Sequence, residues 1–176
     1  MMFEPTSLGG AYIIEPEKIR DDRGFFARSY CGDDFAAHGL EPLREQCNIS
    51  YTIRTGTVRG MHYQEQSHAE AKLVRCTRGA LFDVIIDLRP ASPTYCQWLV
   101  SSLTAANYRM LYVPRGFAHG FQTLEDHTEV FYQMSHPYTA QRASGVRWND
   151  PLFQINWPLP VTVISEKDRS YPDFKK

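Results

Sequence analysis

Short runs of β-branched and aromatic residues recur along most of this chain, and Gly, Pro or Asn residues separate one run from the next. Patterns long enough for an amphipathic helix are nearly absent. The runs predict eight strands, at Cys47–Ile53, Thr57–Tyr63, Lys72–Cys76, Leu81–Leu88, Gln97–Leu103, Met110–Val113, Gly120–Thr123 and Thr128–Ser135. Closely spaced strands joined by short loops favour a mostly-β jelly roll or small barrel.

Helices are expected to be few, short and peripheral. The clearest candidate is Asp33–His38, with Asp33 as the expected N-cap and Gly39 at the C-terminal end. The tail from Trp157 onward contains several prolines and is expected to run extended around the barrel. No linker or repeat divides the chain, so residues 1–176 are predicted to form one domain.

Composition and charge narrow the function classes. Hydrophobic residues make up 43% of the 176 residues, which is ample for a packed core, and the net charge is -1. That balance provides no overall attraction for nucleic acid or an anionic membrane, so any phosphate binding must be local. The chain starts without a basic or long apolar segment, and Cys31, Cys47, Cys76 and Cys96 lack paired spacing, so we expect a cytosolic protein with reduced thiols.

Exposed strand edges in a small sheet favour pairing with another copy of the chain. The apolar segment Tyr12–Ile14 is a candidate strand for such pairing. We therefore expect a homodimer.

Polar and basic residues cluster in the predicted strands from Gln46 to Lys72. Lys72 shares a strand face with Val74 and Cys76, so its charge either needs a partner or ligand or reaches water from the strand end. His62 has a similar ambiguity, since a lone strand histidine is often structural. Strict alternation places Arg59 and His62 on opposite faces, and both reach one cavity only if the strand bulges at Gly60.

A second cluster, Pro114–Phe121, contains a Pro-x-Gly-x-x-His pattern similar to that of the cupin superfamily. Metal-binding cupins usually supply a His-x-His motif as well, and here that position is His62-Tyr63-Gln64. The missing histidine favours a site without a metal. The alternative is a metal-dependent oxygenase or isomerase that uses His62, Gln64 and His119.

Two further segments carry candidate chemistry. Tyr132 shares a strand face with Val130 and Met134, so it is either a polar tip in the cavity wall or a core tyrosine bonded to the backbone. Ser165–Asp168, considered alone, is typical of a solvated turn.

Together these clusters resemble the dTDP-4-dehydrorhamnose 3,5-epimerases, metal-independent members of the cupin superfamily. The resemblance runs through Asp22–Phe26, Gln46–Ser50, Val58–Gln64, Asp87–Arg89, Ser92–Thr94, Pro114–Phe121, Trp148–Pro151 and Ser165–Asp168. It implies a double-stranded β-helix (jelly-roll) barrel without a cofactor. It also implies inversion at C3, C5 or both in a nucleotide-linked 4-keto-6-deoxyhexose. A sugar-nucleotide-binding module without catalysis is the third class, and its expected signature is loss of the base or the acid.

The resemblance also implies roles for individual residues. His62 is the base, Asp168 orients it, Tyr132 supplies a proton from the opposite face, and Lys72 holds the oxyanion. The substrate-binding set comprises Arg23, Arg28, Gln46, Asn48, Arg59, His119, Tyr138 and Lys167. In this set Arg59 is expected to bind the diphosphate and Tyr138 to stack on the base.

Two positions depart from the family pattern, because Arg28 and Ala143 stand where the family has glutamates. If the first glutamate accepts a hydrogen bond from thymine N3–H, Arg28 would suit the N3 acceptor of cytosine better. The hypothesis is a nucleotide other than dTDP. The alternative is that Arg28 points elsewhere and Gln46 and stacking preserve thymidine recognition.

Overall fold

Strands dominate the computed structural model, which describes the backbone of residues 1–176 and every side chain except that of Gln66. The strands are β1 Met2–Pro5, β2 Tyr12–Glu15, β3 Lys18–Asp21, β4 Gly24–Ala27, β5 Gln46–Thr52, β6 Val58–Gln64, β7 Lys72–Arg78, β8 Ala80–Asp87, β9 Trp98–Thr104, β10 Met110–Val113, β11 Phe117–Thr123, β12 Thr128–Met134 and β13 Ala143–Gly145. The helices are α1 Gly32–Ala37 and α2 Glu166–Arg169, with 3-10 turns at Gln66–His68 and Ala140–Arg142. All eight predicted strands are confirmed, and the largest change is at β11, which begins at Phe117 rather than Gly120.

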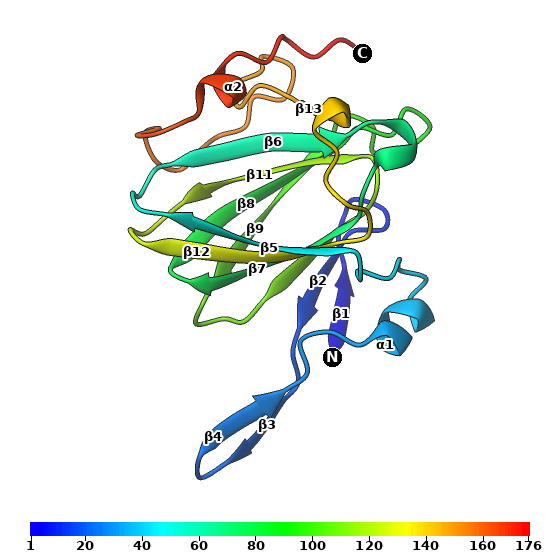
Figure 1. Cartoon of the computed structure of the whole chain (residues 1–176), viewed down its shortest axis with the longest axis vertical. Helices are drawn as coiled ribbons and strands as arrows, with labels where there is room; N and C mark the ends of the chain where they lie inside the picture. Colours follow the sequence, from blue (N-terminus) through cyan, green and yellow to red (C-terminus); the bar gives the residue numbers. More distant parts are fainter.

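Two antiparallel sheets face each other across the body of the molecule (Figure 1). The larger has the order β1-β2-β10-β7-β12-β5 and the smaller the order β13-β6-β11-β8-β9. Strands that follow one another in the chain, such as β6 and β7, often belong to different sheets, which closes the jelly roll. The mostly-β, cupin-like fold is therefore confirmed.

Side chains alternate between the two faces of each strand, so each sheet presents an apolar face on which the other sheet packs. Their inward side chains form one buried apolar cluster, of which Val74, Ile85, Leu111, Phe121 and Val130 are members. Burial of such side chains contributes about 1.5–3 kcal/mol each. The outward residues of the same strands are free to be polar or to line other contacts.

Helix α1 begins one residue earlier than predicted. Cys31, with extended backbone angles, is the N-cap residue, and Asp33 lies in the first turn. The expectation that Asp33 caps this helix was therefore wrong, although its carboxylate still lies near the positive end of the helix dipole. Gly39 ends the helix in the left-handed region at φ +68°, as expected. Among the described residues, no helix is long and apolar enough to cross a membrane.

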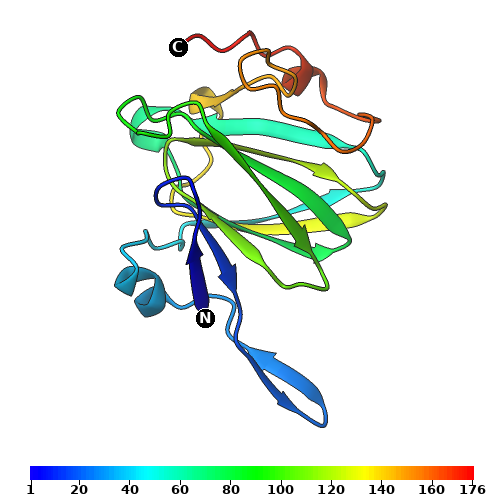
Figure 2. The ribbon, with the colours of Figure 1, turned by 180° about the vertical axis from the view of Figure 1, so that it is seen from behind.

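The N-terminal segment Tyr12–Ile14 was expected to offer a strand edge to a second copy, and the structure shows a different arrangement. β2 pairs with β1 on one side and with β10 on the other, all in the same chain, so it has no free edge to offer a second copy. The hairpin β3–β4, which the polar and apolar pattern did not predict, projects away from the body (Figures 1 and 2). On it Ile19 and Phe26 are 68% and 71% exposed.

The C-terminal tail runs along the barrel as predicted. Leu159 N–H donates to the Gln122 side chain, which donates back to the Leu159 carbonyl. Val163 then forms an isolated parallel bridge with Thr57. These contacts position α2 at the end of the barrel, next to β6 (Figure 1).

A buried carboxylate stabilises the loop after β8 through hydrogen bonds. Asp87 is fully buried and accepts hydrogen bonds from Arg89 Nη2 at 2.7 Å and from the hydroxyls of Ser92 and Thr94, both at 2.6 Å. Burial by itself would raise the pKa of Asp87, but these donors lower it to about 2. The family motifs around Asp87 and Ser92 therefore serve the fold.

This network predicts an acid-sensitive contribution to stability. Because the folded-state pKa of Asp87 lies below its ordinary value of 3.8, the stabilisation is complete above about pH 4 and is lost as the pH falls toward about 2. The loss amounts to about 2 kcal/mol. Asp87→Asn should remove this pH dependence and lower the free energy of unfolding at pH 7 by about 3 kcal/mol.

Urea unfolding at pH 7 and between pH 4 and 2.5 measures both effects. Glu125→Gln, which changes an exposed carboxylate in the turn before β12, is the matched control and should behave as wild type. An Asp87→Asn protein as stable as wild type at pH 7 would contradict the assignment.

Candidate active site

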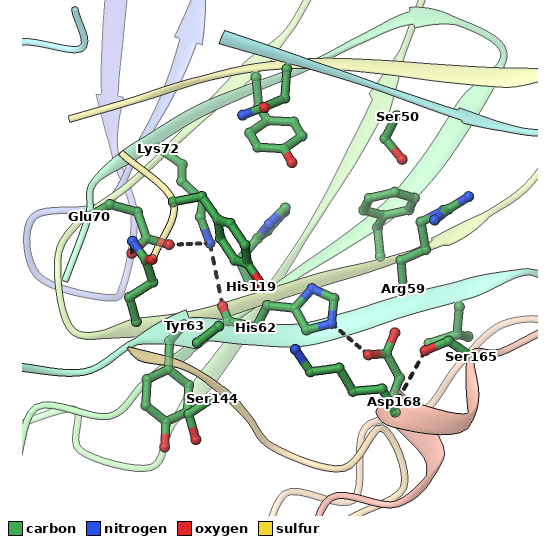
Figure 3. A pocket seen from close by; sticks show the side chains of 18 of the residues that line it. Ser50, Arg59, His62, Tyr63, Glu70, Lys72, His119, Ser144, Ser165 and Asp168 are labelled. Atoms are coloured by element: carbon green, nitrogen blue, oxygen red, sulfur yellow. Dashed lines mark hydrogen bonds and ion pairs between the residues drawn. The ribbon is translucent and has the colours of Figure 1, made fainter. Parts of the chain in front are cut away.

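A cavity of about 630 Å³ opens between the two sheets. β5, β7 and β12 of the larger sheet line one wall, and β6 and β11 of the smaller sheet line the other. The segment around α2 closes one end (Figure 3). Most of the polar residues that the sequence singled out face this cavity.

His62 and Asp168 form a hydrogen-bonded pair at the base of the cavity. His62 Nε2 lies 2.7 Å from Asp168 Oδ1, and the side chain of His62 is 46% exposed while that of Asp168 is 6% exposed. A carboxylate at Nε2 favours the tautomer in which that nitrogen carries the proton. Nδ1 points into the cavity (Figure 3) and is therefore the nitrogen free to accept a proton.

Two further hydrogen bonds hold Asp168 in place. Gly60 N–H donates to Asp168 Oδ2 at 3.1 Å, and Ser165 caps α2 by accepting from the backbone N–H of Asp168. Burial by itself would raise the pKa of Asp168, but the hydrogen bonds from His62, Gly60 and Ser165 lower it. Asp168 is thus a buried, ionised orienting group, and the expectation of a solvated turn at Ser165–Asp168 was wrong.

The bulge required by the sequence argument is present at Gly60. His119 pairs with His62 and Phe121 with Arg59, so β6 uses one more residue than β11 between the two pairs. Gly60 has φ +126°, and a Cβ there would lie 2.5 Å from the Gly120 Cα. The bulge brings Arg59 and His62 to the same cavity, as predicted.

Tyr132 stands on the opposite wall, because β12 belongs to the larger sheet and β6 to the smaller. Val130 and Met134 on the same face are buried, as predicted. Burial raises the pKa of Tyr132, and the negative charge of Glu70 raises it further. The phenol therefore keeps its proton at neutral pH and can act as an acid.

Lys72 is buried rather than extended into water. Its side chain is 9% exposed, and Nζ lies 2.8 Å from Glu70 Oε1 and 3.4 Å from the carbonyl oxygen of His62 (Figure 3). Of the two interpretations of its strand position, the structure supports a lysine with a partner at the cavity.

His119 makes a second histidine–carboxylate pair. Its Nε2 lies 2.8 Å from Oδ1 of Asp83, a fully buried residue of β8. The Gln64 side chain is also hydrogen-bonded, since its amide donates to Glu70 and to the His68 carbonyl. Within the described part of the chain, no group of three or more His, Cys, Asp or Glu side chains is placed to hold a metal ion.

The other predicted binding residues divide into two groups. Gln46, Asn48, Arg59, His119, Tyr138 and Lys167 line the cavity. Gln46 accepts from the Tyr138 N–H at 2.9 Å and donates to Asn48 at 2.8 Å, which joins β5 to the segment after β12. Arg23 and Arg28 do not line the cavity of their own chain. Arg23 pairs with Asp21 at the hairpin tip, and Arg28 lies 3.7 Å from Asp34.

Sequence reasoning missed two buried carboxylates at the site. Glu70 lies just before β7 and two residues before Lys72, and this i, i+2 spacing along extended chain could have identified the pair. Asp83 interrupts an otherwise apolar strand, and such a residue requires a buried partner. The partner of Asp83 is His119, which lies 36 residues further along the chain, whereas Glu70 is bonded by the nearby Gln64.

The cavity therefore opposes a histidine base held by a carboxylate to a protonated phenol, with a buried ammonium between the same two sheets. Two opposed proton carriers and a nearby cation define an acid–base isomerase on a jelly-roll fold.

This chain belongs to the dTDP-4-dehydrorhamnose 3,5-epimerase family, whose model matches residues 5–176. It is 44% identical over 175 residues to a dTDP-4-dehydrorhamnose 3,5-epimerase of Sinorhizobium fredii, covering 99% of this chain and 90% of the relative. The crystal structure of the Bacillus anthracis enzyme with TDP and PPi bound has a TM-score of 0.94 and 42% identity, covering 98% of this chain and 99% of that chain. The Legionella pneumophila enzyme in complex with dTDP-4-keto-L-rhamnose has a TM-score of 0.89 and 32% identity, covering 99% of each chain.

Proposed function

We propose that this enzyme inverts C3 and C5 of a dTDP-linked 4-keto-6-deoxyhexose. The observation that carries the proposal is the His62–Asp168 pair at 2.7 Å, whose free nitrogen faces the cavity opposite Tyr132. The relatives named above support dTDP as the nucleotide.

The reaction needs a base, an acid and a place for negative charge. His62 Nδ1 removes the proton from the carbon next to the C4 ketone, and the electron pair moves onto the ketone oxygen. The Lys72 ammonium stabilises the enolate, which would otherwise be too high in energy for a histidine base. Tyr132 then donates a proton to the other face of the carbon, and the ketone re-forms with inverted configuration.

The cavity residues supply the remaining substrate contacts in this proposal. Arg59 and Lys167 provide positive charge for the diphosphate. Tyr138, 54% exposed at the rim, offers a face for stacking on the base, and Gln46 and Asn48 lie beside it. Ala143 also lines the cavity, where it provides no carboxylate.

We further propose a homodimer in which the β3–β4 hairpin of one subunit completes the cavity of the other. The hairpin carries Arg23 away from its own cavity and exposes Ile19 and Phe26 to solvent. On the outer face of β5, Ile49 and Tyr51 are 68% and 44% exposed. Apolar surface of this kind is typical of protein interfaces. In such a dimer Arg23 and Arg28 would serve the partner's substrate.

Subunit mixing tests this arrangement. His62→Asn and Arg23→Ala should each be nearly inactive, but an unfolded and refolded equimolar mixture should regain roughly a quarter of wild-type activity, because each mixed dimer has one intact site. A mixture as inactive as its components, although dimeric, would show that Arg23 acts in its own subunit.

The epimerase proposal is tested in deuterated water with dTDP-4-keto-6-deoxyglucose and a chelator, with exchange at C3 and C5 followed by NMR. Exchange and inversion at both carbons are expected. Inversion at one carbon would identify a mono-epimerase, and no exchange by folded protein would refute the proposal.

The nucleotide is tested separately with the matched CDP-linked sugar. Arg28 lies outside its own cavity and pairs with Asp34, which weakens the argument for cytosine. We expect clear preference for dTDP. Preference for CDP would instead support base recognition by Arg28 from a partner subunit.

A cytosolic location and a single domain over residues 1–176 complete the proposal. The four cysteines carry free thiols. The barrel, N-terminal strands and C-terminal tail pack on buried clusters that adjoin the same two sheets.

A further inference from the structure

Beside Lys72 lies a buried carboxylate that the mechanism above does not use. Glu70 and Lys72 are joined at 2.8 Å, and both side chains are less than a tenth exposed. Lys72 also donates to the His62 carbonyl at 3.4 Å. Figure 3 shows the ammonium between these two acceptors. These two acceptors, His62 on β6 and Glu70 just before β7, define where the flexible lysine stem can place its charge.

Glu70 is itself held by Gln64. Gln64 Nε2 donates to Glu70 Oε2 and to the His68 carbonyl, both at 3.0 Å, and the Thr139 N–H donates to Gln64 Oε1. Gln64 is 4% exposed and Glu70 6%. One carboxylate oxygen thus binds the ammonium and the other is anchored, so the carboxylate keeps its position.

The negative charge of Glu70 affects two residues of the proposed mechanism, Lys72 and Tyr132. A buried ammonium without a partner loses its hydration and tends toward the neutral amine, which could not stabilise an oxyanion. The adjacent carboxylate opposes that tendency. At Tyr132, burial is the larger cause of the raised pKa, and the negative charge of Glu70 adds to it. Glu70 therefore binds the Lys72 ammonium and favours the protonated form of Tyr132.

We propose that Glu70 is a positioning residue that holds the Lys72 ammonium toward the oxyanion and places a negative charge near Tyr132, and thereby sets the alkaline limit of the reaction. This inference rests on the proposed epimerase function. The other charged or titratable groups that face the same space are Arg59, His62 and Tyr63 on β6, His119 on β11, Tyr138 after β12, Lys167 and Asp168 in α2, and Tyr171 after α2. Of these, Arg59 acts on Tyr132 in the opposite sense to Glu70.

The test is the pH profile of kcat/KM for Glu70→Gln, which removes the charge and keeps the shape. The alkaline limb should move to lower pH by about a unit or more, because the variant lacks the negative charge that helps to raise the pKa of Tyr132 and leaves the Lys72 ammonium without its carboxylate partner. Glu70→Asp should restore most of the limb while kcat falls several-fold with little change in KM, since its carboxylate is one methylene shorter. Glu65→Gln, which removes an exposed charge near the same turn, should match wild type.

An unmoved alkaline limb in folded, active Glu70→Gln would overturn the inference. Should Glu70→Gln fail to fold, Glu70→Asp decides, because an unchanged kcat would show that the placement of the carboxylate does not matter. Wild-type protein without exchange at C3 or C5 would refute the proposed function itself. Wild-type exchange with an unmoved limb would refute only the role of Glu70.

Discussion

His62→Asn is expected to lower kcat by about 10³-fold or more and to abolish deuterium exchange at both carbons. An asparagine side chain cannot accept the proton, and general-base catalysis contributes about 10²–10⁴-fold. Asp168 would remain buried without the imidazole, so a small loss of stability is also expected. The measurement is kcat by coupled assay, with exchange followed by NMR.

His127→Asn is the matched control. His127 is exposed, lies outside the cavity and has φ +55°, a conformation that asparagine also adopts readily. It should retain wild-type kcat. If His62→Asn kept more than about a tenth of wild-type exchange, general-base catalysis of the size assigned here would be absent.

Tyr132→Phe should separate exchange from inversion. With the phenol gone, His62 still removes the proton, exchanges it with solvent and returns it to the face from which it came. Inversion should fall by about 10²–10⁴-fold while deuterium exchange continues. NMR of the recovered sugar in deuterated water distinguishes exchanged, uninverted substrate from product.

Tyr95→Phe, in a turn away from the cavity, provides the control and should invert both carbons at the wild-type rate. Equal loss of exchange and inversion in Tyr132→Phe would indicate that Tyr132 assists proton removal rather than its return. Undiminished inversion would mean that another group is the acid.

The site residues differ in how far sequence reasoning could place them. Tyr132 needed only strand alternation, which correctly placed it with Val130 and Met134. Arg59 needed the bulge at Gly60, which the sequence permitted and the close approach to Gly120 explains. Asp168 could not be placed from the local pattern, because its burial depends on how the C-terminal tail packs against β6. Asp168 lies 106 residues after its partner His62 in the chain.

In the N-terminal region the local pattern identified a strand but could not identify the strands with which it pairs. The apolar pattern at Tyr12–Ile14 identified a strand but not its neighbours, and the strand pairs within its own chain. The exposed residues of the β3–β4 hairpin carry no periodic signal, because neither of its faces packs on the core.

The sequence by itself determined eight strands of the barrel, the inward faces of those strands and the family to which the chain belongs, since these depend on local alternation and on ordered motifs. It did not identify the short outer strands β1 and β13. The tertiary structure decided which charges meet. It joined His62 to Asp168, His119 to Asp83 and Lys72 to Glu70, and it separated Arg23 from its own cavity. The reason is that a strand pattern states which way a side chain points, whereas the partner it finds there depends on how distant strands register.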